Sequence, residues 1–180
     1  MRYVINKKAK PISYQFDPYK NEAVTRTYYD VQFIVIHNTG NVGDTAKNNV
    51  LYFSPSGGNT RSAGANFFVD QRGKIGKSIP IKNVAYHCGG ARQSEKGGAY
   101  FNRCKNWNSV GIELCDIMDK APSEKMIKSV KKLVKMIRKY CPNARTIIRH
   151  YDVNGKDCPH RFAVDGEAWK KFKKGIGGDI

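Results

Sequence analysis

The side chains best suited to metal chemistry in this sequence are a few histidines and one cysteine. His37 follows the apolar run Phe33–Ile36, and His150 follows Thr146–Arg149. Both runs are short and rich in β-branched residues, as buried strands are, and strand ends are where sites form in open α/β sheets. Cys158 lies eight positions after His150, across an Asn-Gly pair that favours a turn. Two imidazoles and one thiolate make a three-ligand zinc site with a fourth position open for water, which is the catalytic arrangement.

The other histidines and cysteines carry a weaker signal. A single histidine is more often a satisfied core or surface residue than a ligand, and only its occurrence together with Lys156 and Cys158 favours a metal site. His160 is expected at the surface or just outside the ligand set. The five cysteines are odd in number and irregularly spaced, which does not indicate a disulfide framework. Four of them are expected to be small buried hydrophobic residues: Cys88, Cys104, Cys115 and Cys141.

Strands and helices alternate along the chain, which predicts an α/β domain. After an N-terminal segment, residues 1–29, that is expected to be irregular, the predicted strands are Phe33–Ile36, Asn66–Asp70, Lys74–Pro80, Ser109–Cys115 and Thr146–Ile148. The predicted helices are Asp44–Phe53, Ser123–Tyr140 and Gly166–Lys174. Asp44 and Ser123 are the predicted N-caps of the first two. We expect one catalytic domain over residues 1–174 and the start of a flexible linker at 175–180.

The composition describes a basic, globular chain of 180 residues. Its net charge is +17, from 32 Lys and Arg against 15 Asp and Glu, and such an excess implies an anionic partner. No apolar run approaches the ~20 residues of a membrane span. The basic N-terminus has no apolar stretch behind it, so no signal peptide is predicted. The oligomeric expectation is a monomer.

Five sequence segments, in order, resemble the zinc N-acetylmuramoyl-L-alanine amidases of the peptidoglycan-recognition type, especially bacteriophage endolysin catalytic domains. They are Phe33-Ile-Val-Ile-His37-Asn-Thr39, Ala65-Asn-Phe-Phe-Val-Asp-Gln-Arg-Gly-Lys-Ile75, Ala85-Tyr-His87-Cys-Gly-Gly90, Asn108-Ser-Val-Gly-Ile-Glu113-Leu-Cys115 and His150-Tyr-Asp-Val-x-x-Lys156-x-Cys158-Pro159. The resemblance covers about Phe33 to Phe162. It implies a central mixed β-sheet flanked by helices.

The resemblance also implies roles for individual residues. His37, His150 and Cys158 would bind one zinc ion per chain, and His87 and Asn66 would lie in the substrate groove. Glu113 would be the general base, and Lys156 would stabilise the oxyanion. The chain departs from many relatives in carrying Asn66 where they have a histidine, and from some in carrying Ala65 where they have a catalytic tyrosine. Both departures place more of the chemistry on Glu113.

These roles agree with what amide hydrolysis requires. An amide carbonyl must be polarised and a water activated, and bound zinc does both by lowering the pKa of its water from about 15.7 to roughly 7. Glu113 stands in the apolar sequence Val110–Leu114, where a carboxylate is costly to bury unless it has a use. Glu113 as an ion-paired structural residue, and Lys156 as one more surface lysine, remain the alternatives.

The expected function is hydrolysis of the amide between the lactyl group of N-acetylmuramic acid and L-alanine in peptidoglycan, causing cell-wall lysis. The protein would be made in the cytoplasm of a bacterial host, be released to the wall, and adsorb to anionic wall polymers through its basic surface. A non-catalytic peptidoglycan-binding module of the same fold is the alternative, although such a module needs no third zinc ligand. A nucleic-acid-binding domain is disfavoured because the lysines are scattered and no known motif occurs.

Overall fold

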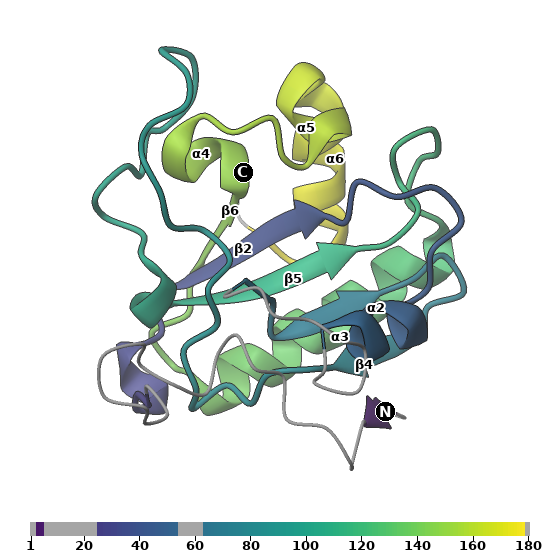
Figure 1. Ribbon diagram of the computed structural model, residues 1–180, viewed down its shortest axis with the longest axis horizontal. Coiled ribbons are helices and arrows are strands. Elements are labelled where there is room, and N and C mark those ends of the chain that lie inside the picture. Colours follow the sequence, from purple (N-terminus) through teal and green to yellow (C-terminus); the bar gives the residue numbers. More distant parts are fainter. Residues whose placement is uncertain (1–2, 6–24, 54–62, 179–180) are drawn as a thin grey trace.

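The computed structural model describes residues 3–5, 25–53 and 63–178. Its centre is one six-stranded sheet in the order β1-β4-β3-β5-β2-β6, with β3 and β4 antiparallel and the other neighbours parallel (Figure 1). The strands are β1 (Tyr3–Ile5), β2 (Phe33–Asn38), β3 (Phe67–Val69), β4 (Ile75–Lys77), β5 (Ser109–Leu114) and β6 (Thr146–Arg149). The helices are α2 (Ala46–Tyr52), α3 (Glu124–Tyr140), α4 (His150–Asn154), α5 (His160–Val164) and α6 (Gly166–Gly175). The predicted α/β fold with a mixed sheet is confirmed.

The two faces of the sheet pack against different parts of the protein, because side chains alternate along each strand. Ile34 and Ile36 of β2 and Ile112 of β5 join the main core with α3 and α6. Phe33 and Val35, of the other parity, pack instead with the segments around Cys88, Cys104 and Val153. His37 shares that parity and therefore lies on the face opposite α3. In Figure 1, α3 runs behind the sheet, and α2 lies on the near side.

Local sequence accounts for the two longest helices. The Ser123 hydroxyl accepts a hydrogen bond from the Met126 amide and caps α3, as predicted. Met126, Val130, Leu133 and Ile137 form the buried face of α3, as the spacing of apolar residues predicts. At α6 the Asp165 side chain accepts from the Ala168 amide. Ile176, one residue past α6, is fully buried in the main core.

Three expectations about elements need correction. Residues 3–5 are not irregular but form β1, which pairs in parallel with β4; residues 1–2 and 6–24 lie outside the described ranges. Thr45, not Asp44, caps α2, because its hydroxyl accepts from the Asn48 amide. The predicted domain boundary at 174 moves to at least Ile176, whereas 179–180 lie outside the described residues.

The remaining observations bear on chemistry and location. All five cysteines are free thiols and are buried. None of the helices in the described part of the chain has the length and apolar character needed to cross a bilayer.

Candidate metal centre

The three predicted ligands meet at the carboxyl end of β2. His37 is the fifth of the six residues of β2, His150 opens α4 directly after the neighbouring strand β6, and Cys158 follows α4. All three are buried, and their ligand atoms lie within 4.8 Å of one another. His37 Nδ1 lies 3.7 Å from Cys158 Sγ, and the His37 and His150 ring centroids are 4.7 Å apart. Strand pairing of β2 with β6 brings together residues more than a hundred positions apart.

This cluster fits a zinc ion better than it fits a closed hydrophobic interior. Both ring nitrogens of His150 are buried and have no hydrogen-bond partner. Buried polar atoms are nearly always paired, so an imidazole with neither nitrogen hydrogen-bonded keeps a lone pair free to bind a metal ion. Two histidines and a thiolate are donors that Zn²⁺ takes in catalytic sites.

Burial sets the protonation of the ligands before any metal binds. It lowers the pKa of His150 to about 4 and holds that of His37 well below its usual value, and in both cases the charge of Lys156 adds to the effect. Burial raises the pKa of the Cys158 thiol to about 12, and the carboxyl of Glu113 adds to this shift. Near neutral pH the imidazoles are therefore neutral and the thiol is protonated.

A chain of hydrogen bonds fixes which nitrogen of His37 faces the metal position. Ser109 Oγ lies 2.6 Å from the Lys105 carbonyl and 3.1 Å from His87 Nε2. Because the carbonyl can only accept, the Ser109 proton is directed to it, and Oγ accepts from the Nε2–H of His87. With Nε2 carrying the proton, Nδ1 of His87 presents its lone pair 3.0 Å from His37 Nε2. His37 Nε2 therefore donates, which leaves the Nδ1 lone pair facing Cys158.

A glycine in β5 makes room for the His87 ring. A Cβ atom at position 111 would lie 2.8 Å from Cγ of that ring, closer than real contacts allow, and 3.0 Å from Nδ1, a very tight contact. Asn66 holds this glycine in place, since its side-chain oxygen accepts from the Gly111 amide at 3.0 Å. The Asn66 nitrogen lies 3.3 Å from the Ile79 carbonyl, and the residue is fully buried. Asn66 thus supports the floor under His87 and has no surface from which to touch a substrate.

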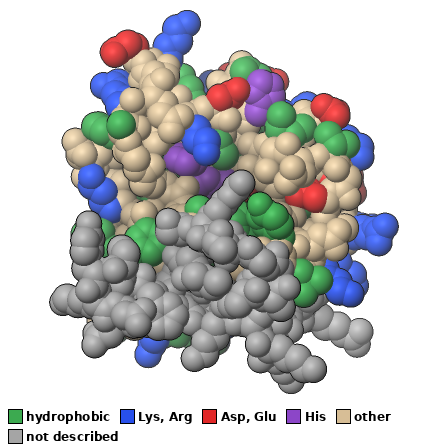
Figure 2. Space-filling model, viewed as in Figure 1, with side chains coloured by type: hydrophobic (Ala, Val, Ile, Leu, Met, Phe, Trp, Pro, Cys, Tyr) green, Lys and Arg blue, Asp and Glu red, His purple; other side chains and the backbone are tan. Residues whose placement is uncertain are grey.

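Glu113 lies beside the metal ligands on the same face of the sheet. It is the register partner of His37 on the neighbouring parallel strand. Its Oε2 is buried without a hydrogen-bond partner. Burial raises the pKa of the Glu113 carboxyl to about 8, against the opposing influence of Lys156. Glu113 and Lys156 line one cavity of about 630 Å³, and Figure 2 shows histidine side chains reaching the surface of this face beside a basic side chain.

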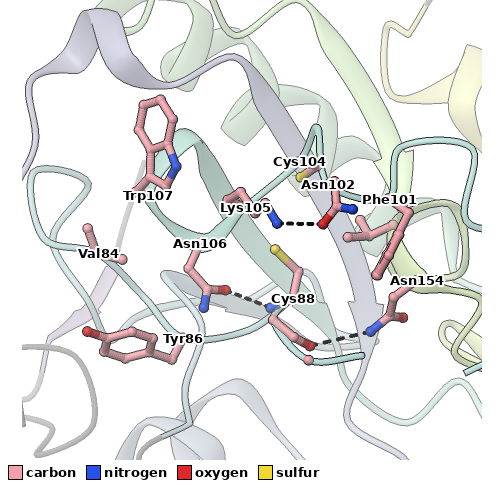
Figure 3. A pocket seen from close by; sticks show the side chains of 13 residues that line it. Val84, Tyr86, Cys88, Phe101, Asn102, Cys104, Lys105, Asn106, Trp107 and Asn154 are labelled. Atoms are coloured by element: carbon pink, nitrogen blue, oxygen red, sulfur yellow. Dashed lines mark hydrogen bonds between the residues drawn. The ribbon is translucent and has the colours of Figure 1, made fainter. Parts of the chain in front are cut away.

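A second cavity, of about 410 Å³, lies next to the His87 loop and contains none of the predicted site residues (Figure 3). Its asparagines hold that loop. Asn106 Oδ1 accepts from the amides of His87 and Cys88 at 3.0 and 2.9 Å. Asn154 donates to the Gly89 carbonyl at 3.3 Å and accepts from the Lys156 amide at 3.1 Å, so it joins the His87 loop to the Lys156 turn.

Sequence reasoning assigned the ligands, Glu113, Lys156 and His87 to one site, and the structure places them around one point. It did not find Ser109 or Gly111, nor the loop anchors Asn106 and Asn154. A signal for the first two exists, because Ser109, Gly111 and Glu113 occupy alternate positions of one strand. Asp152 caps α4, since its carboxylate accepts from the Arg149 amide at 2.8 Å.

Known proteins resemble this chain in sequence and in fold. A family model described as N-acetylmuramoyl-L-alanine amidase (Amidase_2) matches residues 27–161. A probable N-acetylmuramoyl-L-alanine amidase of Bacillus licheniformis is 32% identical over 151 residues, covering 81% of this chain and 41% of that protein. The amidase CwlA of Bacillus subtilis strain 168 is 30% identical over 154 residues, covering 83% and 50%. This chain therefore spans half or less of the length of these relatives.

The fold likeness extends over the whole chain. A mutant endolysin from Bacillus subtilis superposes with a TM-score of 0.68 at 23% identity, covering 98% of this chain and 99% of that one. The solved catalytic domain of XlyA gives a TM-score of 0.69 at 23% identity, covering 98% and 100%. The family model spans most of the chain, including all three clustered ligands, and the chain belongs to the Amidase_2 family of N-acetylmuramoyl-L-alanine amidases.

Proposed function

We propose that this chain is a zinc-dependent amidase that hydrolyses the bond between the lactyl group of N-acetylmuramic acid and L-alanine in peptidoglycan. The observation that carries the proposal is the buried cluster of His37, His150 and Cys158. Beside it lies Glu113, whose Oε2 is buried without a hydrogen-bond partner and which lines one cavity together with Lys156. Membership of the amidase family supports the choice of bond.

His37, His150 and Cys158 would hold the ion, which when bound supplies Lewis acidity for an amide carbonyl and for a water. Glu113 accepts the proton of the attacking water and delivers it to the departing nitrogen. A pKa raised toward neutral suits both transfers, since the group then gains and loses a proton near working pH. The exposed ammonium of Lys156 stabilises the negative charge that develops on the carbonyl oxygen.

A non-catalytic peptidoglycan-binding module is the second candidate, because the same fold could bind without cutting. Two features favour the enzyme. Cys158 completes a three-donor set that a binder does not need, and a proton-transfer role accounts for the desolvation cost of the unpaired Oε2 of Glu113.

Anionic wall polymers are the partner we propose for the basic surface. Six lysines of α3 are exposed: Lys125, Lys128, Lys131, Lys132, Lys135 and Lys139. Across the described ranges none of them pairs with a carboxylate. We further propose that the protein acts on the bacterial wall after release from the cell that makes it.

The test of the reaction is mass spectrometry of digested peptidoglycan. An amidase leaves a free amine on L-alanine and an intact N-acetylmuramic acid, whereas a glycosidase would leave a new reducing sugar end. Glu113→Gln keeps the shape of the side chain but cannot take a proton, so hydrolysis should fall about 10²–10⁴-fold. Zinc content and thermal midpoint should match the parent, and the exposed Glu95→Gln should behave like the parent. Undiminished hydrolysis by Glu113→Gln would place the base elsewhere.

A further inference from the structure

Asp44 is a partly buried carboxylate without a cation. It ends the loop between β2 and α2, and its Oδ2 accepts from the Asn49 side chain at 2.6 Å. Its Oδ1 is buried and has no hydrogen-bond partner. Among the residues that the structure describes, no lysine, arginine or histidine forms an ion pair with it.

This state is unusual in a chain with 32 Lys and Arg. By comparison, Asp116 pairs with Lys120 at 2.9 Å and accepts from the Gly43 amide, and Asp152 pairs with Arg149 at 2.6 Å. In the described part of the chain, only Asp44 and Glu113 have a buried carboxylate oxygen without a partner. Glu113 has a proposed chemical role, but Asp44 has none in the reaction.

Local structure does not explain Asp44 either. The sequence predicts it as the N-cap of α2, yet the hydroxyl of Thr45 performs that function. A second carboxylate, Asp70, lies 3.3 Å from the Ala46 amide at the start of the helix. Asp44 is therefore released from capping and lines the cavity that also contains Glu113 and Lys156.

The cavity is built for a polar, extended ligand. At about 630 Å³ it is far larger than a few waters. Four asparagines contribute to its lining: Asn38, Asn41, Asn48 and Asn49. The amides of Asn38 and Asn49 are engaged within the protein, which leaves Asn41 and Asn48 as amide donors and acceptors for a peptide backbone. Tyr52 and Phe53 add an apolar wall, and the hydroxyl of Thr39 is a further buried atom without a partner.

We infer that this cavity takes the peptide side of the scissile amide and that Asp44 binds the side-chain ammonium of a diamino acid in that peptide. The inference rests on the proposed amidase function. Asp44 is partly exposed and lines the cavity, so an ammonium in the cavity would give its carboxylate a charge-assisted hydrogen bond and neutralise its charge. The N-acetylated sugars on the other side of the bond offer no cation.

Cross-linking gives this contact a consequence. The side-chain amine of the diamino acid is free in a single peptide stem but is acylated once two stems are joined. Acylation removes the charge and adds bulk at Asp44. The enzyme should therefore prefer stems that are not cross-linked through that amine.

The experiment compares two synthetic substrates, N-acetylmuramoyl-L-Ala-γ-D-Glu-L-Lys with the lysine amine either free or acetylated. We expect the parent to have a kcat/KM about ten- to hundredfold higher for the free amine, the range typical of a charge-assisted hydrogen bond. Asp44→Asn should bring that ratio close to one. Asp119→Asn, at an exposed position outside the cavity, should keep the parent's ratio.

The outcomes separate the inference from the function on which it rests. Equal kcat/KM of the parent on both substrates overturns the role of Asp44 while leaving the amidase intact, and this result does not depend on whether Asp44→Asn folds. An unchanged ratio in a folded Asp44→Asn also overturns it. Failure to cleave the amide of either substrate contradicts the proposed function itself.

Discussion

His37 receives its metal-binding tautomer from residues that do not contact the metal position. The order of donors runs from His37 through His87 to Ser109 and ends on the Lys105 carbonyl. The direction of each hydrogen bond is fixed by the following one, because the Lys105 carbonyl at the end of the chain can only accept. Partners of this kind commonly tune metal affinity as strongly as activity.

Removing the Ser109 hydroxyl should weaken zinc binding. In Ser109→Ala, Nε2 of His87 loses its fixed acceptor, so His87 can present either nitrogen to His37. We expect zinc affinity to fall about 10–100-fold, measured by competition with a chromophoric chelator. Ser109→Thr keeps a hydroxyl and should recover part of the loss. Equal zinc affinity in Ser109→Ala and the parent would show that the tautomer is fixed in another way.

Zinc binding should release one proton per chain near pH 7. The imidazoles contribute none, because their lowered pKa values leave them neutral, whereas Cys158, with a pKa of about 12, arrives protonated and must ionise to bind. Apparent affinity should therefore rise about tenfold per pH unit above neutrality, until the pH approaches that pKa. Calorimetry in buffers of different ionisation enthalpy measures the count. Cys158→Ser should release no proton, and a parent that releases none would contradict the assigned thiol state.

Residue types and spacing predicted the ligand set but not its support. His37, His150 and Cys158 are visible because few side chains bind zinc and each follows a recognisable strand or turn. Asn66 was placed in the substrate groove, yet its amide is consumed by main-chain groups. Asn106 and Asn154 carry no signal in the sequence, because they act by hydrogen-bonding the His87 loop, which lies next to them only in the folded chain.

At the level of elements, β5 carries the site on one of its two faces. Ser109, Gly111 and Glu113 point to the metal face, and Val110, Ile112 and Leu114 point to the core. A two-residue period in Ser-Val-Gly-Ile-Glu-Leu therefore contains the hydroxyl, the space for His87 and the proposed base. Glu113 interrupts an apolar strand because its side chain points to the metal face and not to the core.

Gly111→Ala should displace the His87 ring without unfolding the sheet. The added methyl would meet the ring at 2.8 Å, and the ring can shift only by giving up its contact with His37 or Ser109. We expect hydrolysis to drop about tenfold or more, since misplacement by 1 Å can cost about 10²-fold. Gly166→Ala is the matched control because nothing lies within 4 Å of its new methyl. A Gly111→Ala variant with parental activity would mean that the ring has another place to go.

Elements with strong local signals were predicted closely, and those that depend on distant partners were not. α3 has its cap and apolar stripe in its own sequence. β1 exists as a strand through parallel pairing with β4, about seventy residues away. α4 is a single short helix where the Asn-Gly pair suggested only a turn; the Asp152 cap begins it, and Gly155, with φ of 79°, ends it.

At the scale of the whole molecule, the exposed lysines of α3 and the proposed metal centre lie on opposite faces of the sheet. The exposed lysines belong to α3, whose apolar stripe packs on the face formed by Ile34, Ile36 and Ile112. Arg138 is an exception among the basic residues of this helix, since it donates to the carbonyls of Ala144, Arg145 and Gly177 and so holds the C-terminal segment.

Reversing charge on α3 should weaken wall binding but not the chemistry. Lys128→Glu with Lys135→Glu should lower binding to intact walls about tenfold or more at low salt, since each lysine near an anionic surface contributes about 1 kcal/mol. Lys82→Glu with Lys96→Glu has the same net charge and should bind more like the parent. Hydrolysis of a soluble muramyl peptide should be equal in all three proteins. Equal wall binding by the two double variants would make net charge, not α3, the determinant.

The separation of the two faces makes wall binding through α3 independent of amide hydrolysis at the metal centre. If α3 holds the chain on the wall as proposed, the reaction face turns away from the polymer that is bound, and the bond that is cleaved would belong to a different strand of the wall. Release of the cleaved peptide would then leave the binding of α3 to the wall unchanged. Dwell time on the wall and the rate of each cleavage become separate properties of one small domain, free to be altered independently by substitutions on either side of the sheet.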